Sequence, residues 1–220
     1  MKLLAVRMAR SIWLVPQYFF NPQGIYTRPA IEALKARYSF IKIPPPELLV
    51  GVPPSDGIKF EGGAFAGKNG MVSITSVTLH ADGLVVDTRS STDDGDAFLE
   101  DATDWLSKEY GLPSYVELPI KRIYASELNV IFEHTPKVFD SRLASFLQDA
   151  SSIIGDEKIG KTDFLGFLLA TDPANSDRTQ TFRFEREINT PFAENRFYSF
   201  APIKTHLHVK LLEKLEQVAR

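Results

Sequence analysis

The chain has 220 residues, of which 44% are hydrophobic and 11% aromatic, so it can bury the core of one large or two small domains, which excludes wholesale disorder. Its formal net charge of −3 provides no basic field, which disfavours nucleic acid as a partner, because that binding depends mostly on clustered Lys and Arg. The absence of cysteine excludes disulfides, thiolate metal sites and cysteine nucleophiles.

Residues 1–17 mix apolar and basic side chains in an order that favours a strand over a signal peptide. Arg7 and Arg10 interrupt the apolar run that a secretory signal needs. The apolar residues fall on alternate positions, as on one face of a strand: Leu4, Val6, Met8, Ile12 and Leu14. We therefore expect a first β-strand and a cytoplasmic protein, with no segment apolar enough to span a membrane.

Residues 27–38 predict a short helix, because Thr27 and Pro29 suit its first turn. A strand is expected over residues 38–43, and consecutive prolines end it. A proline-rich connector then leads to a second candidate strand over residues 58–65.

A β-hairpin and an amphipathic helix are predicted over residues 71–110. Asp82 and Gly83 supply the positive φ angles of a tight turn between two β-branched runs. The next stretch begins with hydroxyl and acidic residues suited to a helix N-terminus, and Gly111 ends it. The apolar residues of this helix share one face: Phe98, Leu99, Ala102, Trp105 and Leu106.

The second half of the chain predicts the same kinds of element in a similar order. A strand contains Leu128, Val130 and Phe132, and the helical spacing that follows Thr135 and Pro136 continues until Gly155. Strands are expected around residues 163–170, 180–188 and 196–200. A terminal helix begins at about Lys204.

The order of elements predicts an α+β fold of two similar halves, residues 1–112 and 113–220. Each half is expected to be a mainly antiparallel sheet packed against two helices. The amino acids of the two halves do not align, so internal duplication is a hypothesis that rests on the order of elements alone.

Two motifs resemble ligand sites but fail on spacing or context. The segment GGAFAGKNG, residues 62–70, follows the spacing of a phosphate-binding loop up to Asn69, which stands where Ser or Thr would hold magnesium. Asp93, Asp94 and Asp96 lie at a helix start, where the helix dipole already favours acids, and no calcium-loop pattern follows them. We therefore expect neither a metal nor a cofactor.

The segment KTHLHVK, residues 204–210, places two of the four histidines two positions apart. Such residues point about 200° apart on a helix, so the pair cannot chelate one ion. We expect His206 on the solvent side and His208 toward the core, in a helix that Thr205 caps. The expected apolar stripe of this helix consists of Leu207, Leu211, Leu215 and Val218.

The segment NTPFAENRFYSFAPIK, residues 189–204, is the best candidate binding surface, because aromatic residues beside an arginine are common anchors of recognition. The candidate residues are Arg196, Phe197, Tyr198 and Phe200. The alternative is that these rings complete the core beneath the last helix. Just upstream, Glu185 and Glu187 share a strand face with Arg183, which fits a solvated sheet better than a pair of catalytic carboxylates.

Elimination leads us to expect a non-enzymatic protein-binding or assembly subunit that pairs with itself or with a larger partner. Neither a serine-hydrolase elbow nor a dinucleotide fingerprint is present. The alternative is a hydrolase or phosphodiesterase, in which scattered histidines act as acid–base groups beside Asp or Glu: His80, His134, His206 and His208. A third hypothesis is a small-ligand sensor with a cleft between the halves and the proline connector as a lid.

Overall fold

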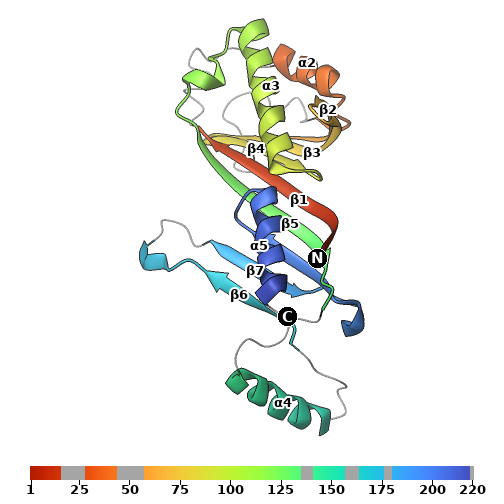
Figure 1. Ribbon diagram of the computed structural model, residues 1–220. Coiled ribbons are helices and arrows are strands. Elements are labelled where there is room, and N and C mark those ends of the chain that lie inside the picture. The colour runs from red at the N-terminus through yellow and green to blue at the C-terminus, as the bar shows by residue number, and fades with distance from the viewer. Residues whose placement is uncertain (16–27, 44–56, 135–140, 157–163, 176–179, 219–220) are drawn as a thin grey trace. The chain divides into compact units, whose positions relative to one another are not determined.

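The computed structural model describes residues 1–15, 28–43, 57–134, 141–156, 164–175 and 180–218 (Figure 1). Helices combine with a large antiparallel sheet, which confirms the predicted α+β class. The eight strands form one sheet, however, and not a separate sheet in each half as the sequence predicts. None of the helices in these ranges is long and apolar enough to cross a membrane.

The described elements follow one another as strands, helices and short 3-10 turns. The strands are β1 (Lys2–Leu14), β2 (Ile58–Gly67), β3 (Gly70–His80), β4 (Gly83–Thr88), β5 (Lys121–Ile131), β6 (Gly166–Ala170), β7 (Thr181–Arg186) and β8 (Arg196–Ala201). The helices are α2 (Arg28–Tyr38), α3 (Thr92–Tyr110), α4 (Ser141–Asp156) and α5 (Thr205–Val218). The strand order is β2-β3-β4-β1-β5-β8-β7-β6.

Contacts divide the chain into two compact units. We call Met1–Ala5, Glu127–Ala201 and Leu207–Arg220 the β6 unit, and Val6–Ser126 with Pro202–His206 the β3 unit. Strands β1 and β5 and helix α5 contribute residues to both units.

In the β3 unit, the predicted hairpin forms, and His80 pairs with Gly83 across its turn. The turn residues are Ala81 and Asp82, however, and neither Asp82 nor Gly83 takes the positive φ that the sequence predicts. A side chain at position 83 would clash, because an added Cβ would lie 2.2 Å from the carbonyl oxygen of Trp13. The segment GGAFAGKNG runs along β2 into the turn before β3. It therefore forms a hairpin connection, as its sequence predicts.

Helix α3 begins and ends as its sequence predicts. Ser91 is the N-cap, and its hydroxyl oxygen accepts from the backbone N–H of Asp94 at 3.0 Å. Gly111 ends the helix in the left-handed conformation, with φ of 65°. The apolar face of α3 enters the core of the β3 unit, where Phe98 and Leu99 are almost fully buried.

Strand β1 is confirmed, but its more deeply buried face is not the one that its alternating apolar residues predict. Ala9, Ser11 and Trp13 are fully buried, whereas the large even-numbered residues are only half-buried. Helix α3 approaches this face closely, since a Cβ added to Gly95 would lie 2.9 Å from Ser11 Oγ. Small side chains therefore occupy the tightest contact, and hydropathy alone points to the wrong face.

The strand expected over residues 38–43 does not form. Tyr38 closes α2, Ser39 takes a positive φ of 54°, and only Lys42 forms a bridge, with Glu61 of β2. The N–H groups of Ile41 and Lys42 both donate to the carbonyl of Glu61 at 3.1 Å. These residues therefore cover the middle of the outer edge of β2.

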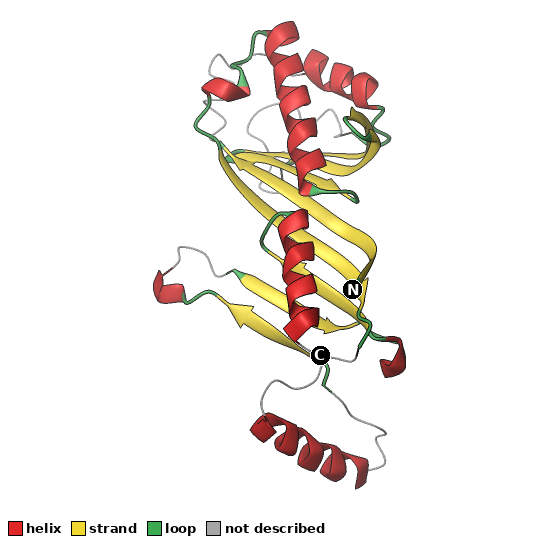
Figure 2. Cartoon of the chain, viewed as in Figure 1, coloured by secondary structure: helices red, strands yellow, loops and turns green. Residues whose placement is uncertain are grey.

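In the β6 unit, α5 lies across one face of the strands β5, β8 and β7 (Figure 2). The buried residues of this face form an apolar cluster of strand and helix side chains: Leu128, Val130, Phe132, Phe184, Phe197 and Leu212. Strand β7 pairs antiparallel with both β6 and β8.

Helix α5 confirms the predicted terminal helix but turns a different face to the strands. Thr205, His208, Leu212 and Glu216 are its buried residues. The expected stripe is largely exposed instead, with Leu207 at 45% and Val218 at 72%. Polar contacts of His208 and Glu216 with the strands hold this orientation, so hydrogen bonding prevails over hydropathy here.

Helix α4 is confirmed over Ser141–Asp156, and the N-terminal start expected at Thr135 and Pro136 lies outside the described residues. Two members of its predicted apolar face, Phe146 and Ile153, are 63% and 68% exposed.

Candidate functional site

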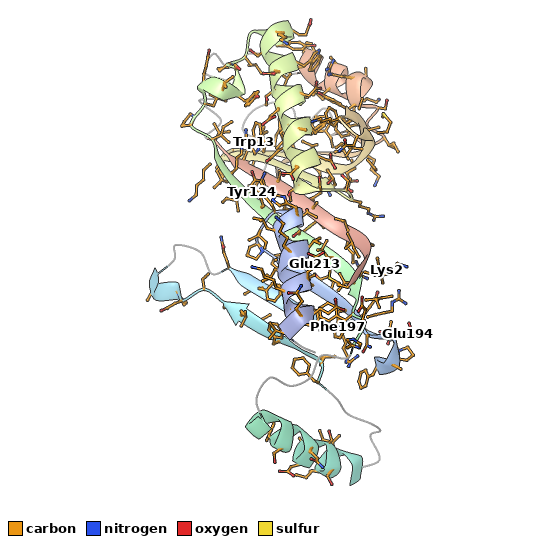
Figure 3. All side chains as sticks on the ribbon, in the orientation of Figure 1. Lys2, Trp13, Tyr124, Glu194, Phe197 and Glu213 are labelled. Atoms are coloured by element: carbon orange, nitrogen blue, oxygen red, sulfur yellow. The ribbon has the colours of Figure 1, made fainter. Side chains whose placement is uncertain are left out.

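Three of the four predicted surface residues project from one face of β8. Arg196, Tyr198 and Phe200 occupy alternate positions and are half-buried. Since successive side chains of a strand point to opposite faces, they lie on the face opposite α5. Phe197 points the other way and is fully buried against Phe184, so the structure removes it from the candidate surface (Figure 3).

Arg196 belongs to a polar cluster with residues from β5 and from the connection after β7. Its Nε lies 3.2 Å from Glu187 Oε2, and the other carboxylate oxygen of Glu187 accepts from Asn129 Nδ2 at 2.8 Å. The backbone N–H of Glu187 donates to the carbonyl of Arg196 at 3.0 Å. A second acid, Glu194, lies 3.5 Å from the Arg196 guanidinium. The guanidinium is thus held between two carboxylates at the start of β8.

The hydrogen bonds of this cluster are incomplete. Among the residues that the structure describes, three buried side-chain polar atoms lack a hydrogen-bond partner: Asn129 Oδ1, Glu187 Oε2 and Arg196 Nε. All three belong to this one cluster, and the angle between Arg196 and Glu187 is unsuitable for a hydrogen bond although the atoms are close. A buried polar atom without any partner costs about 1–3 kcal/mol of stability. This applies most directly to Asn129 Oδ1, because Arg196 Nε and Glu187 Oε2 remain paired as ions at 3.2 Å. Unsatisfied groups of this kind concentrate at functional or strained sites.

Tyr198 extends the cluster along β8. Burial and the nearby carboxylate of Glu127, which accepts a hydrogen bond from it, together raise the pKa of its phenol to about 12. On β7, Arg183 and Glu185 form a loose ion pair at 3.9 Å. The face therefore presents a neutral phenol among charges of both signs.

The candidate histidines are distributed over both units. His80 and His206 belong to the β3 unit, and His134 and His208 to the β6 unit. As predicted, His206 is exposed and His208 is fully buried. Among the described residues, His206 forms an ion pair with a carboxylate, since its Nδ1 lies 3.2 Å from an oxygen of Asp93.

His208 and Ser199 form a close pair that resembles a nucleophile and its base. Ser199 Oγ lies 2.8 Å from His208 Nε2, but it also donates to the carbonyl of Arg183 at 2.8 Å. Since the hydroxyl proton is used in that bond, His208 must donate to the serine and cannot accept its proton. Both side chains are fully buried. The pair therefore joins α5 to β8 and is not arranged for catalysis.

The acidic residues at the start of α3 have structural partners. Lys204 Nζ lies 2.8 Å from Asp93, which lowers the pKa of that carboxyl. Asp96 is buried and accepts from Trp13 Nε1 at 3.0 Å and from the Tyr124 hydroxyl at 2.8 Å. Within the described parts of the chain, no group of three or more histidine and acidic side chains could hold a metal ion.

Sequence reasoning identified Arg196, Tyr198 and Phe200 but missed Glu127 and Asn129. Asn129 stands between Leu128 and Val130, which marks it as a polar residue on the other face of a strand. The sequence therefore shows that Asn129 lies on the polar face of its strand. It does not show which strand becomes the neighbour of this one, because pairing between distant segments depends on the whole fold.

A scan against family models found no match, and searches of curated proteins and of solved structures found no significant similarity. The assignment of function therefore depends on the geometry described above.

Proposed function

We propose that this chain is a non-enzymatic protein-binding or assembly subunit, and that Arg196, Tyr198 and Phe200 form its binding surface. The observation that carries the proposal is the incomplete polar cluster beneath these residues. A fold that held Arg196 only for its own stability would satisfy its guanidinium fully. The three buried atoms are out of reach of a partner, but the Arg196 side chain is 36% exposed, so a partner could bond to the rest of its guanidinium and offset the cost of the cluster.

The composition of the surface favours protein over nucleic acid. Arginine and tyrosine are enriched in the energetically dominant positions of protein interfaces. Here the arginines alternate with acids, since Arg183 neighbours Glu185 and Arg196 neighbours Glu187. A phosphate backbone would be repelled by these carboxylates, whereas a protein surface with charges of both signs complements them. We keep the cytoplasm as the proposed location, because a chain without cysteine has no need of an oxidising compartment.

A photo-crosslinker placed at Tyr198 provides the test. With benzoylphenylalanine at position 198 in cells that naturally express the protein, we expect covalent adducts with one protein species. The same amino acid at Met71, which is 72% exposed in the β3 unit, is the matched control. Adding Tyr198→Ala to a crosslinker at Phe200 should reduce the adduct at least tenfold, since tyrosines at interface centres contribute about 2 kcal/mol or more. Equal yields at positions 198 and 71 would refute the proposed surface.

We also propose that the two halves are duplicated units. The element order β1-α2-β2-β3-β4-α3 is repeated as β5-α4-β6-β7-β8-α5. The strand orders β2-β3-β4-β1 and β6-β7-β8-β5 also correspond, read inward from each end of the sheet. Duplication of an ancestral unit explains this correspondence more simply than chance does.

Reciprocal contacts at the starts of α3 and α5 support the duplication. The N–H of Thr92 donates to the hydroxyl oxygen of Thr205, and the N–H of Thr205 donates to that of Thr92, both at 3.1 Å. Serines on the corresponding strands also act alike, since Ser11 donates to the carbonyl of Thr92 and Ser126 to that of Ile203. Exchange of equivalent contacts is typical of elements related by a two-fold axis.

If Thr92 and Thr205 are equivalent, removing the hydroxyl group of either residue should destabilise the protein equally. We expect Thr92→Val and Thr205→Val each to lower the free energy of unfolding by about 1–2 kcal/mol, because each leaves one buried N–H without an acceptor. Urea denaturation of both variants measures this. Thr75→Val, at an exposed position of β3, is the control and should change stability little. A large loss in only one of the two variants would contradict the equivalence.

A further inference from the structure

The two strands at the ends of the sheet differ in how their outer edges are protected. β2 and β6 stand at the ends of the strand order. On β2, the bridge from Lys42 occupies the backbone of Glu61, and Lys42 and Lys59 both form ion pairs with the Glu61 side chain. Charged side chains and a covering segment are the means by which proteins prevent pairing at an edge strand.

β6 shows no such protection in the part of the chain that the structure describes. It has the sequence GFLLA and carries no charged residue. Leu165, Leu168 and Leu169 are 58%, 57% and 59% exposed. An apolar edge strand this exposed would be an aggregation hazard, unless it is a pairing site.

The hydrogen bonds to β7 show which backbone groups of β6 face outward. Arg186 N–H donates to the carbonyl of Leu165, and Thr171 N–H donates to that of Gln180. Bonded pairs alternate in an antiparallel ladder, so the odd-numbered residues of β6 bond to β7. Gly166, Leu168 and Ala170 therefore direct their N–H and C=O groups to the open edge.

A hollow beside Gly166 complements one exposed side chain of the same strand. The hollow has a volume of about 240 Å³ and is lined by Leu165, Gly166, Phe167, Leu168, Arg183 and Glu185. Glycine is required here, because a Cβ at position 166 would lie 2.1 Å from the carbonyl oxygen of Phe184. The residue at position 166 therefore adds no side chain to the hollow. Most of the walls of the hollow are apolar, so an apolar side chain such as leucine can fill it.

We propose that a second copy of this chain adds its β6 antiparallel to this edge, with Phe167 opposite Phe167 of the second copy. This goes beyond the proposed function, because it adds a self-pairing interface that is separate from the binding surface on β8. In this register Gly166 lies opposite Leu168 of the second copy, and the pair exchanges both outward hydrogen bonds. The leucine enters the hollow at Gly166, and the two-fold axis repeats the contact. On the other strand face, Leu165 lies opposite Leu169.

Charge complementarity favours a second copy with this register. Glu185 pairs with Gly166 across β6 and β7, and Arg183 pairs with Leu168. When Gly166 faces Leu168 of the second copy, Glu185 and the other copy's Arg183 share one row on the same face. Shifting the register so that Leu168 faces its own counterpart would place two arginines in one row and leave the hollow empty. Only the register centred on Phe167 places the large side chain of Leu168 opposite glycine and also places an acidic residue in the same row as a basic one.

The first test is the mass of the full chain in solution. Sedimentation equilibrium should give a concentration-dependent species of about twice 24.7 kDa. Leu168→Pro removes one outward N–H without touching the bonds to β7, and Leu168→Asp places a charge in the hollow. Both should weaken dimerisation at least tenfold. Met71→Asp changes an even more exposed apolar residue elsewhere and should leave the dimer intact. Circular dichroism establishes that each variant is folded.

The second test determines the register and uses the absence of cysteine in the chain. Directly opposed residues of a non-hydrogen-bonded pair are close enough for a disulfide, whereas residues offset by two positions are not. Under mild oxidation, Phe167→Cys should form a disulfide-linked homodimer and Leu168→Cys should form at least tenfold less. The reverse result would refute the register.

A chain that is monomeric at every concentration, or a dimer that survives both Leu168 variants, would overturn the proposed interface. Neither outcome affects the binding surface on β8, because a crosslink from position 198 to a different protein would still form. Conversely, a β6 dimer without any adduct at position 198 would refute the surface alone.

Discussion

Replacing Phe197 with alanine should lower the free energy of unfolding by about 3–5 kcal/mol. The ring of Phe197 is fully buried and stacks on Phe184, with ring centres 4.6 Å apart and planes inclined by 18°. Phe132 lies 5.2 Å away, and the Arg186 guanidinium packs over the ring at the same distance. Truncation would leave a cavity with apolar walls and would remove one of the two aromatic contacts of the buried Arg186, which also packs over Phe192.

Phe200→Ala is the matched control for this prediction. Phe200 lies three residues along the same strand but on the other face, and it is only half-buried. Its loss should therefore lower the free energy of unfolding much less, while reducing the crosslinking expected at Tyr198. Urea denaturation of both variants provides the comparison. Equal destabilisation by the two variants would show that the two faces of β8 do not differ as described.

Acid should destabilise the protein through His208. Burial lowers the pKa of its imidazole to about 4, from an ordinary value near 6.5. Below pH 6.5 the unfolded chain binds a proton that the folded chain refuses, so the free energy of unfolding falls with the pH. The stability is fully present above pH 6.5 and is lost as the pH falls toward 4. Over that window the loss amounts to about 3 kcal/mol.

The variant His208→Gln isolates this contribution. Glutamine keeps a donor for Ser199 but does not titrate, so the difference between wild type and variant cancels the other ionisable groups. Urea unfolding between pH 5 and pH 8 should give a steeper fall in stability for the wild type. Parallel curves would show that His208 is protonated in the folded state or is not buried as described.

The elements of the fold were largely readable from the sequence, because periodicity and caps act locally. Ser91 and Gly111 mark the ends of α3, and Asp82 with Gly83 marks the place of the hairpin between β3 and β4, although the turn itself lies one residue earlier, on Ala81 and Asp82. The faces that these elements bury were less predictable. On α5, Glu216 is buried and Leu207 is exposed, against their hydropathy, since Glu216 accepts from the backbone N–H of Glu133, which is far away in the chain.

The candidate site was predictable in part for the same reason. Alternation along β8 separates Arg196 and Tyr198 from Phe197 once a strand is assumed. The partners of Arg196 are a different matter, because Asn129 lies on β5, far away in the sequence. Periodicity identifies which residues share a face of one strand. It does not identify which strands become neighbours, so the polar cluster required the structure.

In the proposed pairing through β6, the bridge between Lys42 and Glu61 would limit how far copies of this chain can associate. A subunit with bare strands at both ends of its sheet would template the next copy indefinitely and grow into a fibre. With one end blocked, each copy offers a single site, and that site is consumed when the first pair closes. Lys42→Pro removes the N–H that Lys42 donates to Glu61, and Lys59→Ala removes an ion pair. Weakening the block in this way would convert the proposed dimer into a filament-forming subunit.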